Sequence, residues 1–227
     1  MNIIKAIIRQ VLHTGIIFKV CEKLSYIQFK KLIKQLQNSG DLKLHLGCGS
    51  QVLADWINVD AELSKNVLTM KLPCGLQKLD NNSARYIYTS HFLEHLEYPS
   101  EALEFVTHCH RILAPEGCLR VAVPGIEKII RAYALDNQMF FKLQEKYHPS
   151  WCKTKLEHLM YALQQDGEHR YGYDFETIEK LLSQAGFTKI TCSNFNQSQF
   201  EDLRVDYRAE KDEIGEFLSL YVEAIKE

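Results

Sequence analysis

The chain has 227 residues, of which 46% are hydrophobic and 25% are charged, and its formal net charge is −2. These fractions are close to the averages for globular proteins and exclude a disordered chain, a collagen-like fibre and a disulfide mini-protein. A protein that wraps nucleic acid would normally be more basic, so we expect no nucleic-acid partner.

The first 40 residues differ from the rest of the chain in charge. They carry a net charge of +6, and the remainder carries −8. Apolar residues recur in them at helical spacing, at Ile4, Ile7, Ile8, Val11 and Leu12 and again at Ile27, Leu32, Ile33 and Leu36. The pattern predicts basic amphipathic helices over residues 1–40, interrupted near Gly15. These helices either pack on the following domain with their lysines in solvent, or rest on an anionic membrane surface.

The N-terminal segment does not have the features of a signal peptide or a membrane span. Its apolar run is broken by charged residues, and no small-residue cleavage site follows. The seven cysteines include no C-x-x-C pair, which argues against a zinc ribbon and suits a reducing compartment. We therefore expect a cytoplasmic protein, with at most a weak membrane-surface contact through its N-terminus.

A strand and a glycine turn follow at residue 42. The alternating segment Leu42–Leu46 predicts a strand that runs into Gly47 and Gly49, and a second short strand, Ile57–Val59, ends at Asp60. This order is the layout of a nucleotide-binding α/β unit, in which glycines let the backbone approach the ligand and the acid holds ribose hydroxyls. The crossover from Gly47 to Trp56 has ten residues, which leaves room for about one helical turn.

Two details argue against a nicotinamide dehydrogenase. Val52 stands where the dinucleotide fingerprint has its third glycine. Asp60 follows Gly49 by eleven residues, whereas the fingerprint places its acid about 20 residues on.

Residues 44–50, Leu-His-Leu-Gly-Cys-Gly-Ser, and 55–60, Asp-Trp-Ile-Asn-Val-Asp, resemble motif I and the following acid of class I S-adenosylmethionine-dependent methyltransferases. The short crossover is similar to a subgroup common in bacterial surface-glycan gene clusters. Many of these enzymes have an acid where this chain has His45. The resemblance implies that S-adenosylmethionine is bound by Gly47, Cys48, Gly49, Asp60, Ala61, Leu79 and Ser90.

The middle of the chain continues the resemblance. Residues Arg85–Ser90 predict a buried strand, and the Leu-Glu-His-Leu that follows is similar to the family. A helix is predicted over Ser100–Ile112. Residues Arg111–Gly117 resemble the family's R-x-L-K-P-G-G turn, and Cys118–Val123 predicts the next strand.

Two histidines are candidate bases for an acceptor hydroxyl. His91 follows a strand, whose carboxyl end lines the crevice in open α/β sheets, and His169 lies in a polar, glycine-punctuated loop. The alternative is that each histidine is an ordinary polar surface residue. His91, Glu94 and His95 also match the H-x-x-E-H pattern of inverted zinc peptidases. Because that pattern belongs on a long helix and this one follows a core strand, we expect no metal.

The C-terminal part predicts helices and then two strands. Residues 125–170 predict a helical insertion, and Phe175–Ala185 an amphipathic helix that ends at Gly186. Asp174 either orients a histidine or N-caps that helix. Strands are predicted over residues 189–192 and 219–225, and the last one, Ser-Leu-Tyr-Val-Glu-Ala, extends the family resemblance to residue 226. Asp206 and Arg208 either contact an acceptor or pair in solvent, and we favour solvent.

The fold expected is α/β, a Rossmann-like doubly wound seven-stranded sheet, mostly parallel with an antiparallel last strand. It divides into N-terminal helices over residues 1–40 and a methyltransferase domain over 41–227 with a helical insertion at about 125–170. The resemblance implies an enzyme that transfers a methyl group from S-adenosylmethionine to a hydroxyl of a sugar or glycan intermediate. The alternatives are another small molecule or a protein as acceptor, and a non-catalytic S-adenosylmethionine-binding scaffold.

Overall fold

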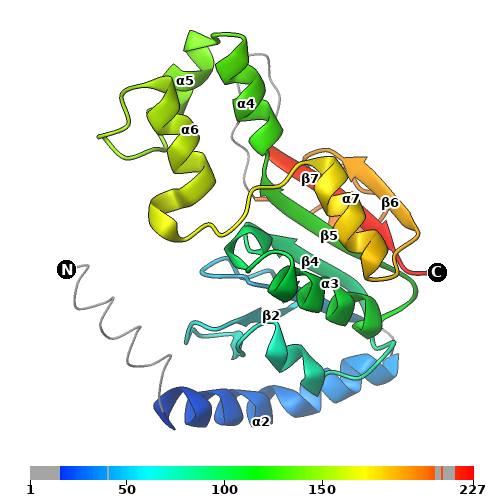
Figure 1. Cartoon of the computed structure of the whole chain (residues 1–227). Helices are drawn as coiled ribbons and strands as arrows, with labels where there is room; N and C mark the ends of the chain where they lie inside the picture. Colours follow the sequence, from blue (N-terminus) through cyan, green and yellow to red (C-terminus); the bar gives the residue numbers. More distant parts are fainter. Residues whose placement is uncertain (1–15, 40, 208–210, 212–217) are drawn as a thin grey trace.

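A computed structural model describes residues 16–39, 41–207, 211 and 218–227. The helix predicted around residues 4–12, Gly15 and Arg208 lie outside the described residues. The centre of the molecule is a seven-stranded sheet with the strand order β3-β2-β1-β4-β5-β7-β6 (Figure 1). Its strands are β1 (Leu42–Leu46), β2 (Ile57–Asp60), β3 (Val67–Thr69), β4 (Ala84–Ser90), β5 (Leu113–Pro124), β6 (Lys189–Ser193) and β7 (Ser219–Ile225).

The direction of the strands confirms the predicted topology. β1 pairs in parallel with β2 and β4, β2 with β3, and β4 with β5. β7 inserts between β5 and β6 and is antiparallel to both. The carboxyl ends of β1, β2, β4 and β5 therefore meet at one edge of the sheet, where a ligand crevice is expected.

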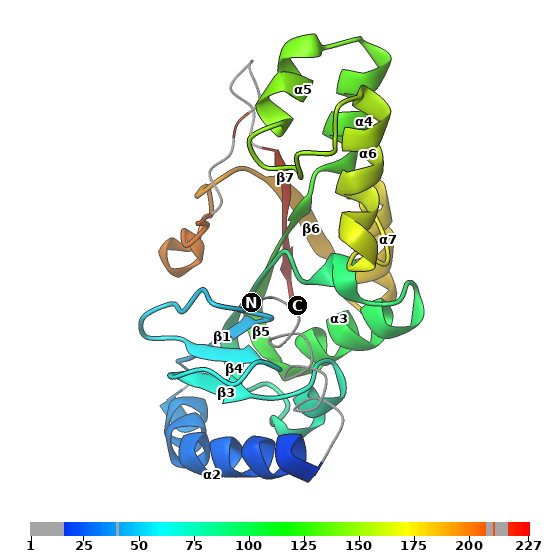
Figure 2. The ribbon, with the colours of Figure 1, turned by 90° about the vertical axis from the view of Figure 1, so that its left-hand side faces the viewer.

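Helices surround the sheet and extend beyond it (Figures 1 and 2). α3 (Ser100–Ile112) and α7 (Phe175–Gln184) lie on one face, and their apolar residues join the main core. Short 3₁₀ turns connect the elements: η1 (Cys74–Lys78), η2 (Leu93–His95), η3 (Gln165–Gly167) and η4 (Glu201–Leu203). The predicted insertion is helical, as α4 (Ile126–Ala134), α5 (Gln138–Gln144) and α6 (Lys155–Gln164), and it projects from the end of β5.

α2 (Ile16–Ser39) packs against the β3 edge of the sheet (Figure 2). Ser25 Oγ accepts a hydrogen bond of 2.9 Å from the Thr69 amide, and Ile33 is buried. Ile27 and Leu32, which the packing interpretation placed at this contact, are instead 59% and 43% exposed. At 100° per residue Ile27 lies about 120° around the helix from Ile33, so both cannot face the sheet. No helix of the described residues is long and apolar enough to cross a membrane.

The crossover between β1 and β2 contains turns, and the helical turn predicted there is absent from its described residues. The Asn58 side chain explains this difference. Its Oδ1 accepts from the Leu53 amide at 2.8 Å, and its Nδ2 donates to the carbonyls of Leu53 and Trp56 at 2.9 and 3.1 Å. The side-chain amide of Asn58 thus forms hydrogen bonds with backbone groups of Leu53 and Trp56 that would otherwise need partners within a helix.

The second face of the sheet is covered by an aromatic cluster and by the segment around η4. Asp206, which we expected to be in solvent, is 7% exposed and accepts from Arg120 Nη2 at 2.6 Å and from Arg120 Nε at 3.1 Å. Arg120 is fully buried on β5 and also donates to Glu223 Oε1 at 2.8 Å. The prediction for Asp206 is therefore wrong, because its carboxylate pairs with the buried guanidinium of Arg120 in the interior of the protein.

Candidate functional site

The chain turns sharply after β1 through two glycines in the left-handed region. Gly47 has φ +68° and Gly49 has φ +53°, a conformation that favours glycine. A Cβ on Gly47 would lie 2.3 Å from the Phe92 ring. A Cβ on Gly49 would meet no described atom within 4 Å, so the backbone there borders open space. The turn is therefore both tight and accessible to a ligand.

Asp60, at the end of β2, fixes this turn. Its Oδ2 accepts from the Gly49 amide at 2.7 Å and its Oδ1 accepts from the Glu62 amide at 2.9 Å. Each carboxylate oxygen has two lone pairs, so each keeps one further acceptor site for ribose hydroxyls. The sequence argument assigned Asp60 to the ligand, and the structure adds a second role in shaping the glycine turn.

A pocket of about 400 Å³ opens beside the turn. Its lining residues are Gly47, Cys48, Gly49, Ser50, Gln51, Ser90, His91 and Tyr207. The pocket therefore brings together four of the seven residues predicted to bind the cofactor. Asp60 lies behind Gly49 and Ala61 follows it, whereas Leu79 packs in the main core. Asp60, Ala61 and Leu79 do not line this pocket, and cofactor binding by all seven residues stays a prediction.

Two titratable side chains near the turn are neutral at pH 7. Burial, reinforced by the charge of Asp60, raises the pKa of the Cys48 thiol to about 12. Burial lowers the pKa of His45 to about 4, although the hydrogen bond to Asn58 and the charge of Asp60 oppose this. His45 Nδ1 is 3.1 Å from Asn58 Oδ1, and the ring is fully buried. His45 therefore belongs to the core of the sheet and does not line the pocket.

His91 occupies the carboxyl end of β4 in an unusual conformation. Its φ is +52°, and a non-glycine residue in this region costs free energy that the surroundings must offset. The amide donates to the Ala122 carbonyl at 2.8 Å, which holds the residue against β5. Nε2 is 3.0 Å from Ser219 Oγ, at the start of β7. The imidazole ring of His91 therefore points from the end of β4 towards the start of β7.

Glu94 and His169 lie behind His91. The Glu94 side chain is 1% exposed, and its Oε1 is 3.4 Å from His91 Nδ1 and 4.0 Å from His169 Nε2. Burial acts to raise the pKa of Glu94, but the neighbouring histidines outweigh it and the pKa is lowered. Burial lowers the pKa of His169, against the opposing charge of Glu94. The cluster thus contains an ionised carboxylate beside a neutral imidazole.

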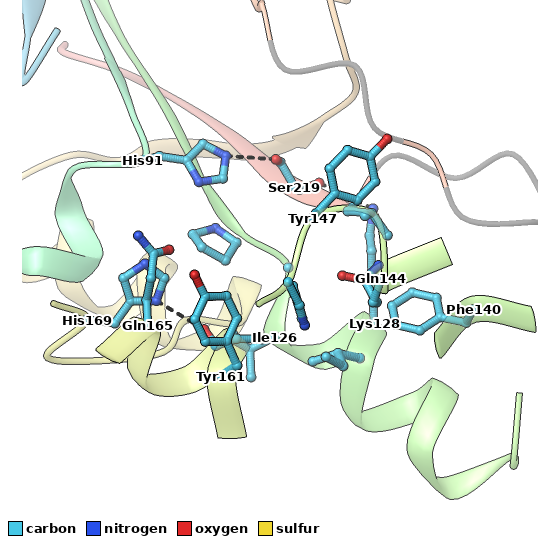
Figure 3. Close-up of a pocket in the computed structure, with 16 residues that line it drawn as sticks. His91, Ile126, Lys128, Phe140, Gln144, Tyr147, Tyr161, Gln165, His169 and Ser219 are labelled. Carbon is cyan, nitrogen blue, oxygen red and sulfur yellow. Dashed lines mark hydrogen bonds between the residues drawn. The ribbon is translucent and has the colours of Figure 1, made fainter. Parts of the chain in front are cut away.

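A second pocket, of about 380 Å³, lies between His91 and the insertion (Figure 3). We call it the insertion pocket. Its polar and aromatic lining includes His91, Lys128, Gln144, Tyr147, Tyr161, Gln165, His169 and Ser219. It therefore brings together the two predicted bases, and His91 also lines the pocket at the glycine turn.

The sequence argument missed the residues that the insertion contributes to this pocket. Gln144 is 5% exposed, and its Nε2 has no hydrogen-bond partner among the described residues. Gln144 follows an apolar run on α5. Such a run predicts residues that face the core and gives no sign of a residue that lines a pocket. Asp174, by contrast, accepts from the Thr177 amide at 2.8 Å, so the N-cap alternative for this residue is confirmed.

The fold is similar to that of solved methyltransferases. A SAM-dependent methyltransferase from Archaeoglobus fulgidus gives a TM-score of 0.50 at 17% identity, over 90% of this chain and 94% of that one. A possible exported protein from Bordetella parapertussis gives 0.47 at 13%, over 88% and 67%. An S-adenosylmethionine-dependent methyltransferase from Mesorhizobium loti gives 0.46 at 15%, over 82% and 91%. No protein-family model and no curated protein matches the sequence.

The first of these likenesses, together with the strand order, defines the class of fold. The sheet is the Rossmann-like sheet of class I S-adenosylmethionine-dependent methyltransferases, with an antiparallel β7. At 17% identity the likeness shows the fold alone. The function has to be argued from the site itself.

Proposed function

We propose that the protein transfers a methyl group from S-adenosylmethionine to a hydroxyl of a sugar or glycan intermediate. The observation that carries the proposal is that His91 lines both pockets. Methyl transfer from a sulfonium is an in-line displacement, so the donor and the acceptor must meet at one point. The class of fold supports the donor, and the resemblance of the short crossover to the surface-glycan subgroup is the basis for the acceptor.

The pocket at the glycine turn fits the methyl donor. Gly49 exposes its backbone to open space, and Asp60 retains acceptor sites for ribose hydroxyls. Gly47, Cys48 and Ser90 complete the wall on this side. When bound, S-adenosylmethionine supplies a methyl group activated by its sulfonium. The residues of the chain position the methyl donor relative to the acceptor.

His91 is the better placed of the two candidate bases. Its Nε2 is already 3.0 Å from a hydroxyl, Ser219 Oγ, and a hydroxyl of the acceptor at this place would transfer its proton to Nε2. The opposite ring nitrogen faces Glu94, whose carboxylate holds the orientation of the ring. His169 donates from Nδ1 to the Ala162 carbonyl at 3.0 Å and directs Nε2 towards Glu94. Its role as a base stays a prediction.

The insertion pocket suits a ligand with several hydroxyls. Gln144 offers a buried amide nitrogen without a partner among the described residues, and Lys128 and Gln165 provide further polar groups. Tyr147 and Tyr161 add aromatic surface that the apolar side of a sugar ring covers. A small apolar acceptor would leave the Gln144 amide nitrogen unpaired, at a cost of free energy.

Two measurements test the proposal. Calorimetry should detect binding of S-adenosylmethionine, and the chain should methylate at least one member of a panel of nucleotide sugars and oligosaccharides. Methylation confined to amines or small apolar alcohols would overturn the sugar acceptor. Binding with no turnover on any acceptor class would favour the scaffold alternative, and absence of binding would overturn the proposed function.

A further inference from the structure

The carboxyl group of Glu94 is buried and lacks conventional hydrogen-bond partners. Neither oxygen makes a hydrogen bond of good geometry among the described residues, and the side chain is 1% exposed. The contact with His91 Nδ1, at 3.4 Å, is at the long limit of a hydrogen bond. A buried carboxyl group whose only polar contacts are this long is unfavourable, and a cation bound beside it would complete its coordination.

His169 directs Nε2 towards this carboxylate, 4.0 Å from Glu94 Oε1, and the His95 ring lies beside that of His169. His95 Nδ1 is 3.0 Å from the Glu168 carbonyl, and His169 Nδ1 is 3.0 Å from the Ala162 carbonyl. A carbonyl oxygen only accepts, so Nδ1 carries a hydrogen in both rings, and Nε2 is the ring nitrogen that remains to bind an ion. A backbone carbonyl that holds one ring nitrogen and frees the other is the usual support of a metal-binding histidine.

We propose that Glu94, His95 and His169 form a binding site for a divalent transition-metal ion. One ligand atom from each of the three lies within 4.8 Å of the others. A tetrahedral zinc site with bonds of about 2.0–2.1 Å needs ligand atoms about 3.3 Å apart, which small side-chain rotations provide. Two imidazoles and one carboxylate select Zn²⁺ or a similar ion over Ca²⁺ and Mg²⁺, which take oxygen ligands.

Backbone hydrogen bonds also hold the two parts of the proposed site together. The amides of Arg170 and Tyr171 donate to the Glu94 carbonyl at 2.7 and 3.2 Å, so the loop that carries His169 is already attached to η2. His169 lines the insertion pocket. An ion between Glu94 and His169 would therefore fix one wall of this pocket. Ion binding does not depend on methyl transfer, so the two proposals can fail separately.

A second cluster with metal-ligand residue types serves as the control. His148, Cys152 and His158 also bring three ligand atoms within 4.8 Å of one another. Here the Nδ1 atoms of His148 and His158 are 2.9 Å apart, so one ring donates to the other and the pair is satisfied without an ion. The cluster of Glu94, His95 and His169 differs from this one because the Glu94 carboxylate has no hydrogen-bond partner among the described residues.

The test uses full-length, tag-free protein stripped of metal with a chelator and titrated with Zn²⁺ in a calorimeter. We expect one tightly bound Zn²⁺ per chain and a higher melting temperature. E94Q should weaken Zn²⁺ binding by more than about 100-fold, because loss of a supporting group alone costs 10–100-fold. H95Q, at a partly exposed position, should do the same if E94Q does not fold. C152S should bind Zn²⁺ like the wild type.

Three outcomes would overturn the metal site. The stripped wild type binds no Zn²⁺, or E94Q and H95Q bind it as tightly as the wild type does, or binding is lost in C152S and kept in E94Q. Calorimetry with S-adenosylmethionine on the same stripped protein separates the proposals. Binding of S-adenosylmethionine without Zn²⁺ binding contradicts the metal site alone, and the reverse contradicts the proposed function alone.

Discussion

Asp60 holds the glycine turn through the Gly49 amide and is also the predicted partner of the ribose, so its replacement should affect the pocket twice. The substitution Asp60→Ala removes the acceptor for the Gly49 amide and the predicted partner of the ribose. We expect the affinity for S-adenosylmethionine to fall by roughly 1–3 kcal/mol, the range for polar groups left unpaired in a site. Isothermal calorimetry measures this directly.

Asp60→Asn is the matched control, because it keeps an oxygen for the Gly49 amide and removes the charge. Its affinity for S-adenosylmethionine should lie between those of the wild type and Asp60→Ala. Added NAD should not compete, since the third glycine of the dinucleotide fingerprint is replaced by Val52. Unchanged affinity in Asp60→Ala would remove this residue from the site.

His45 makes the folded state sensitive to acid. Burial lowers the pKa of His45 from its ordinary 6.5 to about 4. Between these two values the unfolded chain binds more protons than the folded one, so the free energy of unfolding falls as the pH falls from 6.5 to 4. The shift corresponds to roughly 3 kcal/mol for this one side chain. Urea unfolding at several pH values should show a smaller loss of stability in His45→Gln, and an identical pH dependence in both proteins would contradict the assignment.

Residues whose role depends on local spacing could be predicted from the sequence, and those that depend on distant partners could not. Gly47, Gly49 and Asp60 lie within one short unit whose order indicates a nucleotide pocket. Asp206 pairs with Arg120, 86 positions away, and no local pattern reveals that contact. Glu94 was noticed in the H-x-x-E-H pattern, but its neighbour His169 lies 75 positions later, so no local spacing indicated that contact.

The Arg120 cluster is the strongest link between the segment around η4 and the sheet. Arg120 is fully buried and has charged contacts with Asp206 and Glu223 at 2.6 and 2.8 Å. The substitution Arg120→Met leaves two buried carboxylates without their cation, so the free energy of unfolding should fall by about 3–5 kcal/mol. Lys43→Met removes an exposed ion pair with Asp202 of the same segment and should cost at most about 1 kcal/mol. Equal losses in denaturant unfolding would contradict the buried network.

α2 presents a second apolar face that the sheet does not cover. Val20, Leu24 and Ile27 are 49%, 62% and 59% exposed and lie on one stripe of the helix. Exposed lysines lie along one side of this stripe, at Lys19, Lys23, Lys30 and Lys34, and the exposed Lys31 continues the stripe four residues after Ile27. An apolar stripe bordered by lysines is typical of helices that rest on anionic lipid surfaces. We propose this face as the site of the weak membrane contact.

The stripe can be tested without disturbing the packed face of α2. The double substitution Leu24→Glu/Ile27→Glu should abolish flotation with vesicles that contain anionic lipid and leave the melting temperature unchanged. Wild-type binding should weaken with salt, since the Debye length drops from ~10 Å at 0.1 M to ~3 Å at 1 M. Neutral vesicles are the control. Flotation that survives the double substitution, or a wild type that never floats, would contradict the contact.

Longer elements were easier to predict than short ones. The helix at Ser100–Ile112 was predicted with its observed bounds, because a long apolar period and a following turn mark it. Strand β3, Val67–Thr69, has three residues, all buried, and such a run carries no alternation to detect. The fold class was still predicted correctly, because the resemblance to class I methyltransferases supplied the topology of the whole sheet.

At the scale of the whole molecule, the sheet and the insertion supply one pocket each, and His91 is the residue that both pockets share. The substitution His91→Gln should therefore act on the reaction more than on either ligand. We expect kcat to fall by about 10²–10⁴-fold, the usual contribution of a general base, with the affinity for S-adenosylmethionine within about twofold of the wild type. Gln144→Leu, in the insertion pocket alone, is the matched control and should raise KM for the acceptor while keeping kcat. A His91→Gln enzyme that retains wild-type kcat would show that the shared residue only shapes the passage between the pockets.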